Sequence, residues 1–138
     1  MNKEILENTV SKLICKPKGI LAIDESISTC NTRFEKLGVA TTEEKRREYR
    51  ELLVTTPNIE DYVSGYILFD ETLRQSSKSG QTFPSIMKEK GLEIGIKVDK
   101  GPIDLVSSPG DKVTEGLDGL EDRLAEYRNM GASFAKWR

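Results

Sequence analysis

Histidine is absent from this sequence of 138 residues, and its absence removes whole classes of mechanism. Nucleophile pairs of the Ser-His and Cys-His types need an imidazole, and so do most zinc sites. Any proton transfer in this protein must therefore fall to the side chains of Asp, Glu, Lys or Tyr.

Cysteine is scarce, since only Cys15 and Cys30 occur. Their spacing is unlike that of a metal site, and two residues are too few for a disulfide framework. Because free cysteines are usually buried in folded proteins, both are interpreted as buried or partly buried thiols without a redox or catalytic role. Reduced thiols predict a cytoplasmic location.

Long hydrophobic runs are missing as well. Residues 1–19 lack the apolar run and the cleavage site of a signal peptide, and no stretch reaches the ~20 apolar residues of a membrane span. The formal net charge is −2 and the pI is near 5.4, so the overall field attracts neither nucleic acid nor an anionic membrane. Small anionic substrates remain possible, because they need only a local cluster of Lys and Arg.

Several helices are predicted from capping and periodicity in a chain that has the length of one domain. Residues 41–53 begin with a capping box of Thr41 and Glu44 and continue with helix formers. The arginines of this helix lie opposite a face made of Tyr49, Leu52, Leu53 and Thr56. Residues 117–130 repeat leucine at helical spacing before a C-cap glycine, and shorter helices are predicted around residues 5–14 and over residues 85–90.

Four short apolar runs alternate with these helices. They are residues 19–23, 65–69, 94–98 and 132–135. Continuous apolar runs are typical of strands in a parallel sheet, and the alternation with helices is typical of an α/β fold. Propensity alone leaves two possibilities open, an open doubly wound sheet and part of a (β/α)₈ barrel.

Charged residues stand at the end of each apolar run, where the active face of an α/β protein lies. Asp24 follows the first run, Lys97 and Asp99 belong to the third, and Lys136 and Arg138 to the fourth. Since burial of an unpaired ammonium is costly, the two aspartates are the expected partners of the two lysines. Such a lysine–carboxylate cluster without histidine suits carbonyl or imine chemistry on a phosphorylated sugar.

Six sequence motifs point to a particular protein family. They are GILAIDES (19–26), TEEKRREYRELL (42–53), GYILFDETL (65–73), GIKVDKG (95–101), GLDGL (116–120) and FAKWR (134–138). In their order and spacing they resemble class I fructose-bisphosphate aldolase, from about residue 5 to the last residue. GLDGL alone would be a weak signal, whereas the combination is highly specific.

The resemblance implies a (β/α)₈ TIM barrel, of which residues 1–138 form the N-terminal half with strands one to four. It also implies reversible cleavage of fructose 1,6-bisphosphate to dihydroxyacetone phosphate and glyceraldehyde 3-phosphate. No metal ion or other cofactor is implied, and members of the family are often homo-oligomers.

Roles are carried over by the resemblance residue by residue. Asp24 matches an aspartate that contacts the substrate near the bond being broken, and Lys136 a lysine that supplies positive charge beside the Schiff base. Lys97 and Arg138 match residues that line the glyceraldehyde-phosphate side of the substrate. Ser26, Thr29 and Arg33 match positions of the phosphate-binding region. Arg46 matches an arginine near the substrate pocket, but the favoured interpretation of Arg46 is an arginine on a solvated helix face.

Two departures from the family pattern stand out. Ile27 and Ser28 replace the Thr-Gly that usually follows the serine of the first motif. The strand-five glutamate, the strand-six Schiff-base lysine and the later phosphate-binding serine and arginine have no counterparts among the 138 residues. We therefore expect a fragment of an aldolase; a non-catalytic sugar-phosphate-binding or scaffolding half-barrel and a pair of half-barrels are the alternatives.

Overall fold

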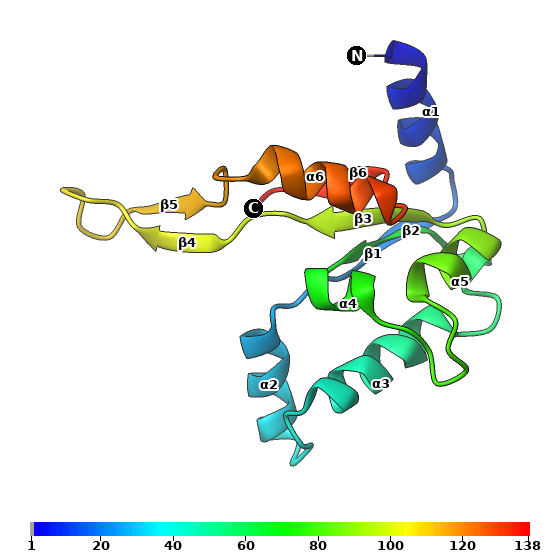
Figure 1. Cartoon of the computed structure of the whole chain (residues 1–138), viewed down its shortest axis with the longest axis horizontal. Helices are drawn as coiled ribbons and strands as arrows, with labels where there is room; N and C mark the ends of the chain where they lie inside the picture. Colours follow the sequence, from blue (N-terminus) through cyan, green and yellow to red (C-terminus); the bar gives the residue numbers. More distant parts are fainter. Residues whose placement is uncertain (1) are drawn as a thin grey trace.

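A four-stranded parallel sheet forms the centre of the computed structural model, which describes residues 2–138. The strands are β1 (Gly19–Ile23), β2 (Val63–Leu68), β3 (Glu93–Lys97) and β6 (Phe134–Lys136), hydrogen-bonded in the order β1-β2-β3-β6. This order follows the chain without a reversal (Figure 1). The predicted α/β fold is confirmed, and the order fits part of a barrel, whereas the doubly wound alternative needs a reversal.

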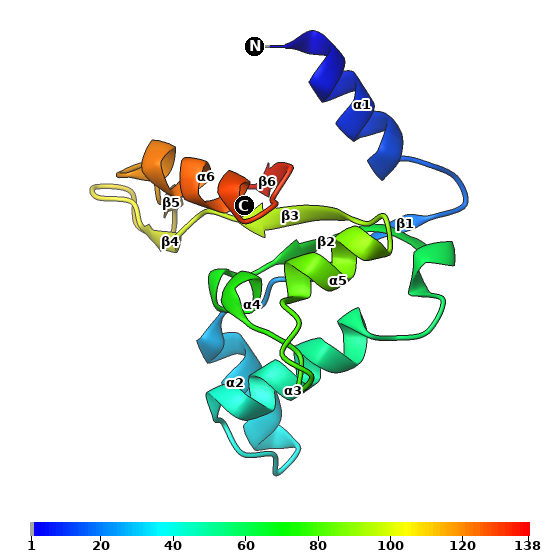
Figure 2. The same cartoon turned by 45° about the vertical axis from the view of Figure 1, so that its right-hand side comes forward.

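Helices form the connections that parallel strands require. The first helix, α1 (Lys3–Leu13), precedes the sheet, and α6 (Leu120–Asn129) precedes β6. The other connections contain α2 (Ile27–Lys36), α3 (Glu43–Val54), the 3-10 helix η1 (Ile59–Asp61), α4 (Asp70–Arg74) and α5 (Phe83–Glu89). Figures 1 and 2 show α2, α3 and α5 on the same side of β1 and β2.

One face of the sheet is buried against these helices. Ile23, Leu68 and Ile96 are aligned across β1, β2 and β3, and each is at most 1% exposed. They belong to one core cluster with Met87 of α5 and Tyr127 of α6. Because full burial of one such aliphatic side chain contributes about 1.5–3 kcal/mol, this row anchors the strands.

The opposite face of the sheet is more open. Ile20 of β1 is 45% exposed there, as expected for an inner barrel face that the rest of a barrel does not cover. Gly95 of β3 lies against the ring of Phe134, and a Cβ at this glycine would come within 2.3 Å of that ring. A side chain at this position would therefore force the Phe134 ring to move.

A two-stranded antiparallel hairpin, which the sequence patterns did not predict, lies between β3 and α6. It consists of β4 (Gly101–Asp104) and β5 (Lys112–Glu115), and it extends away from the sheet (Figure 1). Its apolar side chains Ile103 and Val113 are each 43% exposed. The hairpin therefore contributes little to the core, which is why no buried strand pattern marks it.

The structure corrects the predicted α3 helix in two respects. Its N-cap is Thr42, whose hydroxyl accepts a hydrogen bond from the Lys45 N–H at 3.2 Å, so the predicted capping box at Thr41 is wrong by one residue. Its buried face contains Arg46 and Arg50, whereas Leu52 of the predicted apolar face is 69% exposed, so the prediction of a solvated Arg46 was wrong. Ion pairs formed by these arginines explain the reversal.

Boundaries elsewhere shift by a few residues. Leu117 is 71% exposed and lies before α6, which begins at Leu120. The fourth apolar run begins two residues before β6 and ends one residue before Lys136, the last residue of that strand. Helices α2 and α4 were not predicted, because their polar sequences lack an apolar period.

Candidate functional site

The carboxyl ends of the strands bring Asp24 and Lys136 together. Lys136 Nζ lies 2.6 Å from Asp24 Oδ2, although these residues extend from β6 and β1, the two outer strands of the sheet. In a flat sheet those strands would be roughly 14 Å apart, which a lysine side chain cannot span. The sheet therefore curves, and both side chains lie on its concave side.

Lys97 stands beside Lys136 on this face. The two lysines are direct partners in the register of β3 and β6, and neighbouring partners in a sheet project to the same side. The Lys97 ammonium lies 2.7 Å from Asp99 Oδ1. The predicted pairing of the two lysines with the two aspartates is present, so neither ammonium is buried without a counter-charge.

The segment after β1 forms the helix α2, which the sequence patterns did not predict. Ser26 is the N-cap of α2, and its hydroxyl accepts a hydrogen bond from the Thr29 N–H at 3.3 Å. The hydroxyls of Ser28 and Thr29 each lie 3.0 Å from the Ser26 hydroxyl. Ser28 thus adds a third hydroxyl at a helix N-terminus whose partial positive charge favours anions.

Arg33 lies further along α2, with its NH1 2.5 Å from Glu25 Oε1. Its side chain is 60% exposed, so the guanidinium is open to solvent on one side. An anion that binds Arg33 must therefore compete with Glu25, the residue between Asp24 and the hydroxyl cluster.

Arg50 is a residue of this region that sequence reasoning missed. Its NH1 lies 2.8 Å from Glu25 Oε2, its NH2 donates to the Glu25 carbonyl at 3.1 Å, and its side chain is 3% exposed. The same NH2 also donates to Cys30 Sγ at 3.3 Å. Spacing offered one signal, because Arg46 and Arg50 lie one helical turn apart and share a face.

The two cysteines differ in their surroundings. Cys30 is 2% exposed, and burial, only partly offset by the charge of Arg50, raises the pKa of its thiol. This confirms Cys30 as a buried structural thiol. Cys15 is exposed, so the prediction of burial is wrong for it.

Arg46 braces the helices and does not reach the strand-end cluster. Its guanidinium donates to both carboxylate oxygens of Glu71 at 2.8 and 2.7 Å, and to Asn31 Oδ1 at 3.1 Å. Arg46 is 7% exposed, so the solvated reading of this arginine is wrong. The ion pair with Glu71, with hydrogen bonding as the larger cause, raises the pKa of Arg46 and keeps it charged.

Neither a metal cluster nor a membrane span is found in the part of the chain that the structure describes. Among residues 2–138, no three acidic or cysteine side chains gather closely enough to hold a metal ion. No helix within the same residues has the length and apolarity to cross a bilayer.

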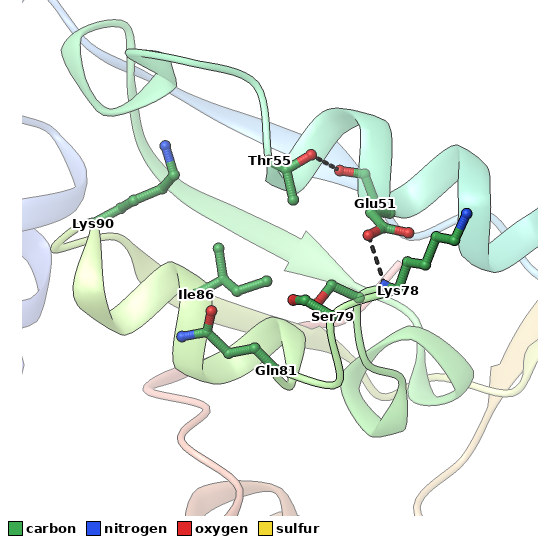
Figure 3. A pocket seen from close by; sticks show the side chains of 8 residues that line it. Glu51, Thr55, Lys78, Ser79, Gln81, Ile86 and Lys90 are labelled. Atoms are coloured by element: carbon green, nitrogen blue, oxygen red, sulfur yellow. Dashed lines mark hydrogen bonds between the residues drawn. The ribbon is translucent and has the colours of Figure 1, made fainter.

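A separate polar cleft of about 530 Å³ lies between α3, α5 and the loop that joins α4 to α5 (Figure 3). Two of its charged side chains are already engaged, since Glu51 accepts from the Lys78 backbone N–H at 2.8 Å and Lys90 pairs with Glu60 at 2.8 Å. The strand-end residues are not part of its lining, so the carboxyl face remains the candidate site.

Comparison with known proteins identifies the family. The family model described as fructose-bisphosphate aldolase class-I matches residues 5–138. The chain belongs to this family. A "Probable fructose-bisphosphate aldolase class 1" from Xylella fastidiosa is 56% identical over all 138 residues. A "Fructose-bisphosphate aldolase 4, cytosolic" from Arabidopsis thaliana is 53% identical over 88% of this chain, and the match covers 31% of the length of that protein.

A solved aldolase structure has the same fold. It comes from Plasmodium falciparum, in a complex with TRAP and a small-molecule inhibitor, and it is 40% identical with a TM-score of 0.95. The match covers 100% of this chain and 41% of that one. The Xylella relative is likewise covered over 41% of its length. The aldolase fold of these residues is therefore shown, for a chain that spans 41% of the length of these relatives.

The pairing of Glu25 predicts an acid-sensitive contribution to stability. Burial alone would raise the pKa of Glu25, but its backbone hydrogen bond and the charges of Arg50 and Arg33 outweigh this and lower it from 4.5. A lowered folded-state pKa gives stability that is complete above the unfolded value and is lost as pH falls through the folded value. We expect Glu25→Gln to destabilise the protein at pH 7, and the difference from the unchanged chain to shrink below about pH 4.5.

Urea unfolding at intervals from pH 7 to pH 3 measures this difference. A gap between the two proteins that stayed constant down to pH 3 would show that the Glu25 charge does not stabilise the fold.

Proposed function

We propose that this chain supplies the first half of the active-site face of an aldolase that reversibly cleaves fructose 1,6-bisphosphate to dihydroxyacetone phosphate and glyceraldehyde 3-phosphate. The observation that carries the proposal is the contact between Asp24 and Lys136 across the concave side of the sheet, with Lys97 beside it. Catalytic residues of barrel enzymes come from the carboxyl ends of several strands, which is where these three side chains lie.

Asp24 and Lys136 are placed for chemistry at the sugar carbonyl. In a Schiff-base mechanism a lysine amine attacks the substrate ketone, and the resulting imine accepts the electrons of the carbon–carbon bond that breaks. The Lys136 ammonium adds positive charge and hydrogen bonds beside that imine. The Asp24 carboxylate, 2.6 Å from Lys136, contacts the substrate near the bond being cleaved and accepts hydrogen bonds from its hydroxyls.

Basic and hydroxyl groups around this pair suit the phosphates of the substrate. Lys97 and Arg138 serve the glyceraldehyde-phosphate side. Ser26 and Thr29 at the start of α2, with Arg33 in its last turn, form the phosphate-binding region. Charge-assisted bonds to phosphate are about twice as strong as neutral ones, so these residues give affinity as well as orientation. The role of Arg46 is to brace this region through Glu71.

The Schiff-base lysine itself belongs to the part of the family's barrel that follows these strands. The short chain alone is therefore expected to bind sugar phosphate weakly and not to cleave it. A cytoplasmic location is part of the proposal; the names of relatives include a cytosolic and a chloroplastic aldolase.

A chimeric protein tests the proposal. The 138 residues replace the matched 41% of the Xylella fastidiosa relative, and cleavage of fructose 1,6-bisphosphate is measured in a coupled assay. We expect activity within about tenfold of that of the Xylella protein, because a swap of half a pocket that keeps every reacting group costs on the order of 1.4 kcal/mol or less.

The matched control is the same chimera with Lys112→Met, a change in the exposed hairpin, which should retain that activity. A soluble, folded chimera without aldolase activity would contradict the enzymatic proposal and favour a binding or scaffolding half-barrel.

A further inference from the structure

Asp99 links three separate pieces of backbone at the carboxyl end of the sheet. Its carboxylate follows β3 and is fully buried. Oδ1 accepts hydrogen bonds from Lys97 Nζ at 2.7 Å and from the Gly101 N–H at 3.1 Å. Oδ2 accepts from the Arg138 N–H at 3.3 Å. One side chain thus joins the end of β3, the start of the hairpin and the end of β6.

The backbone ladder between β3 and β6 does not reach Arg138. Register pairs end at Lys97 and Lys136, and the last backbone bond runs from the Val98 N–H to the Lys136 carbonyl at 3.1 Å. The bond from the Arg138 N–H to Asp99 is the next link along the two strands. A side chain therefore takes the place of the ladder where Arg138 leaves the sheet.

The backbone that carries Asp99 is itself fixed. Arg123 of α6 donates to the Val98 carbonyl at 2.9 Å and to the Gly116 carbonyl at 2.5 Å, which ties the neck of the hairpin to the helix. Gly116 has a φ of +131°, and a Cβ there would come within 2.9 Å of the Lys100 nitrogen. Because the two ends of the hairpin lie this close together and are both bound to α6, the backbone that carries Asp99 holds its carboxylate in a fixed position for its partners.

We propose that Asp99 is a positioning residue: its carboxylate holds the Lys97 ammonium and the backbone of Arg138 in place for one phosphate of the substrate. The inference rests on the proposed function, because the two basic residues are assigned to the glyceraldehyde-phosphate side. Asp99 acts through them and does not touch the substrate.

Two effects of Asp99 on an anionic ligand have opposite signs. Its negative charge opposes binding of a phosphate, so if charge alone mattered, its neutralisation would tighten binding. Its hydrogen bonds order Lys97 and Arg138, so if position matters, the same change weakens binding. The sign of the change in affinity therefore decides between them.

The test compares Asp99→Asn with Glu93→Gln in the 138-residue chain. Glu93 is a matched control at the amino end of the same strand, where it accepts from Ser133 Oγ at 2.5 Å and pairs with Lys12 at 2.9 Å. Binding of fructose 1,6-bisphosphate and of fructose 1-phosphate is followed by heteronuclear NMR titration.

For Asp99→Asn we expect the dissociation constant for fructose 1,6-bisphosphate to rise by about fivefold or more, the effect of losing about one ordered charge-assisted contact. The constant for fructose 1-phosphate, which lacks the second phosphate, should change by less than about twofold. Glu93→Gln should leave both constants unchanged, because amino-end residues of a barrel serve stability.

Tighter binding by Asp99→Asn, or equal effects of the two substitutions, would overturn the positioning role. If the unchanged chain binds neither sugar phosphate, the binding part of the proposed function fails, and amide hydrogen exchange at Arg138 then decides the positioning role alone. Faster exchange in Asp99→Ala than in Glu93→Ala supports it, and equal exchange contradicts it.

Discussion

Replacement of Arg50 by methionine is expected to lower the free energy of unfolding by about 3–5 kcal/mol, the cost of removing one partner of a buried ion pair. The guanidinium is 3% exposed and contacts the Glu25 carboxylate, the Glu25 carbonyl and the Thr72 hydroxyl. Methionine has similar length but leaves all three groups without this donor. Urea unfolding at pH 7 measures the loss.

A matched control lies on the same helix. Lys45 pairs with Glu48 at 2.6 Å, but both side chains are about half exposed, so Lys45→Met should cost no more than about 0.5 kcal/mol. Arg50→Lys keeps the charge without the planar fork and should fall between the two. A cost for Arg50→Met as small as that for Lys45→Met would show that the buried pair contributes no net stability.

The Arg50 pair also shows what the sequence could not predict. Periodicity placed the arginines of α3 opposite the apolar face, and Arg46 was interpreted as solvated because charged residues are rarely buried without a partner. The partners Glu25 and Glu71 lie 25 residues away from Arg50 and Arg46, and no local pattern connects such distant positions. The burial of these arginines is a tertiary effect that only the assembled fold reveals.

The strand ends, by contrast, were predictable from two simple rules. Four apolar runs separated by helices predicted a parallel sheet, and parallel strands place their carboxyl ends at one edge. Charges after each run then identified Asp24, Lys97 and Lys136 as neighbours, and the contact across the sheet confirms it. The same rules missed α2, because its N-terminal hydroxyls read equally well as a polar loop.

The curvature of the sheet connects fold and proposed chemistry. Asp24 and Lys136 meet only because β1 and β6 approach each other on the concave side, so their ion pair depends on the packing of all four strands. Gly95 and Phe134, which pack β3 closely against β6, therefore support the site from within the sheet.

Borohydride reduction in the presence of dihydroxyacetone phosphate is expected to leave the mass of the 138-residue chain unchanged. An amine must be neutral to attack a ketone. Lys136 and Lys97 instead each form an ion pair with a carboxylate, that of Asp24 at 2.6 Å and that of Asp99 at 2.7 Å. In the active chimera we expect a stoichiometric adduct on a lysine outside these 138 residues, found by peptide mass spectrometry.

Lys136→Met in the chimera distinguishes two roles of Lys136, that of a charge beside the imine and that of the attacking amine. If Lys136 supplies charge beside the imine, trapping should continue on the same outside lysine but cleavage should slow by about 10²–10³-fold, the usual effect of losing one electrostatic contact to a transition state. An ammonium nearby also lowers the pKa of a neighbouring lysine, so its removal should raise the pKa of the attacking lysine. Less of that lysine is then neutral near neutral pH, and the trapping rate should fall most there. A stoichiometric adduct on Lys136 in the short chain would instead make Lys136 the attacking amine.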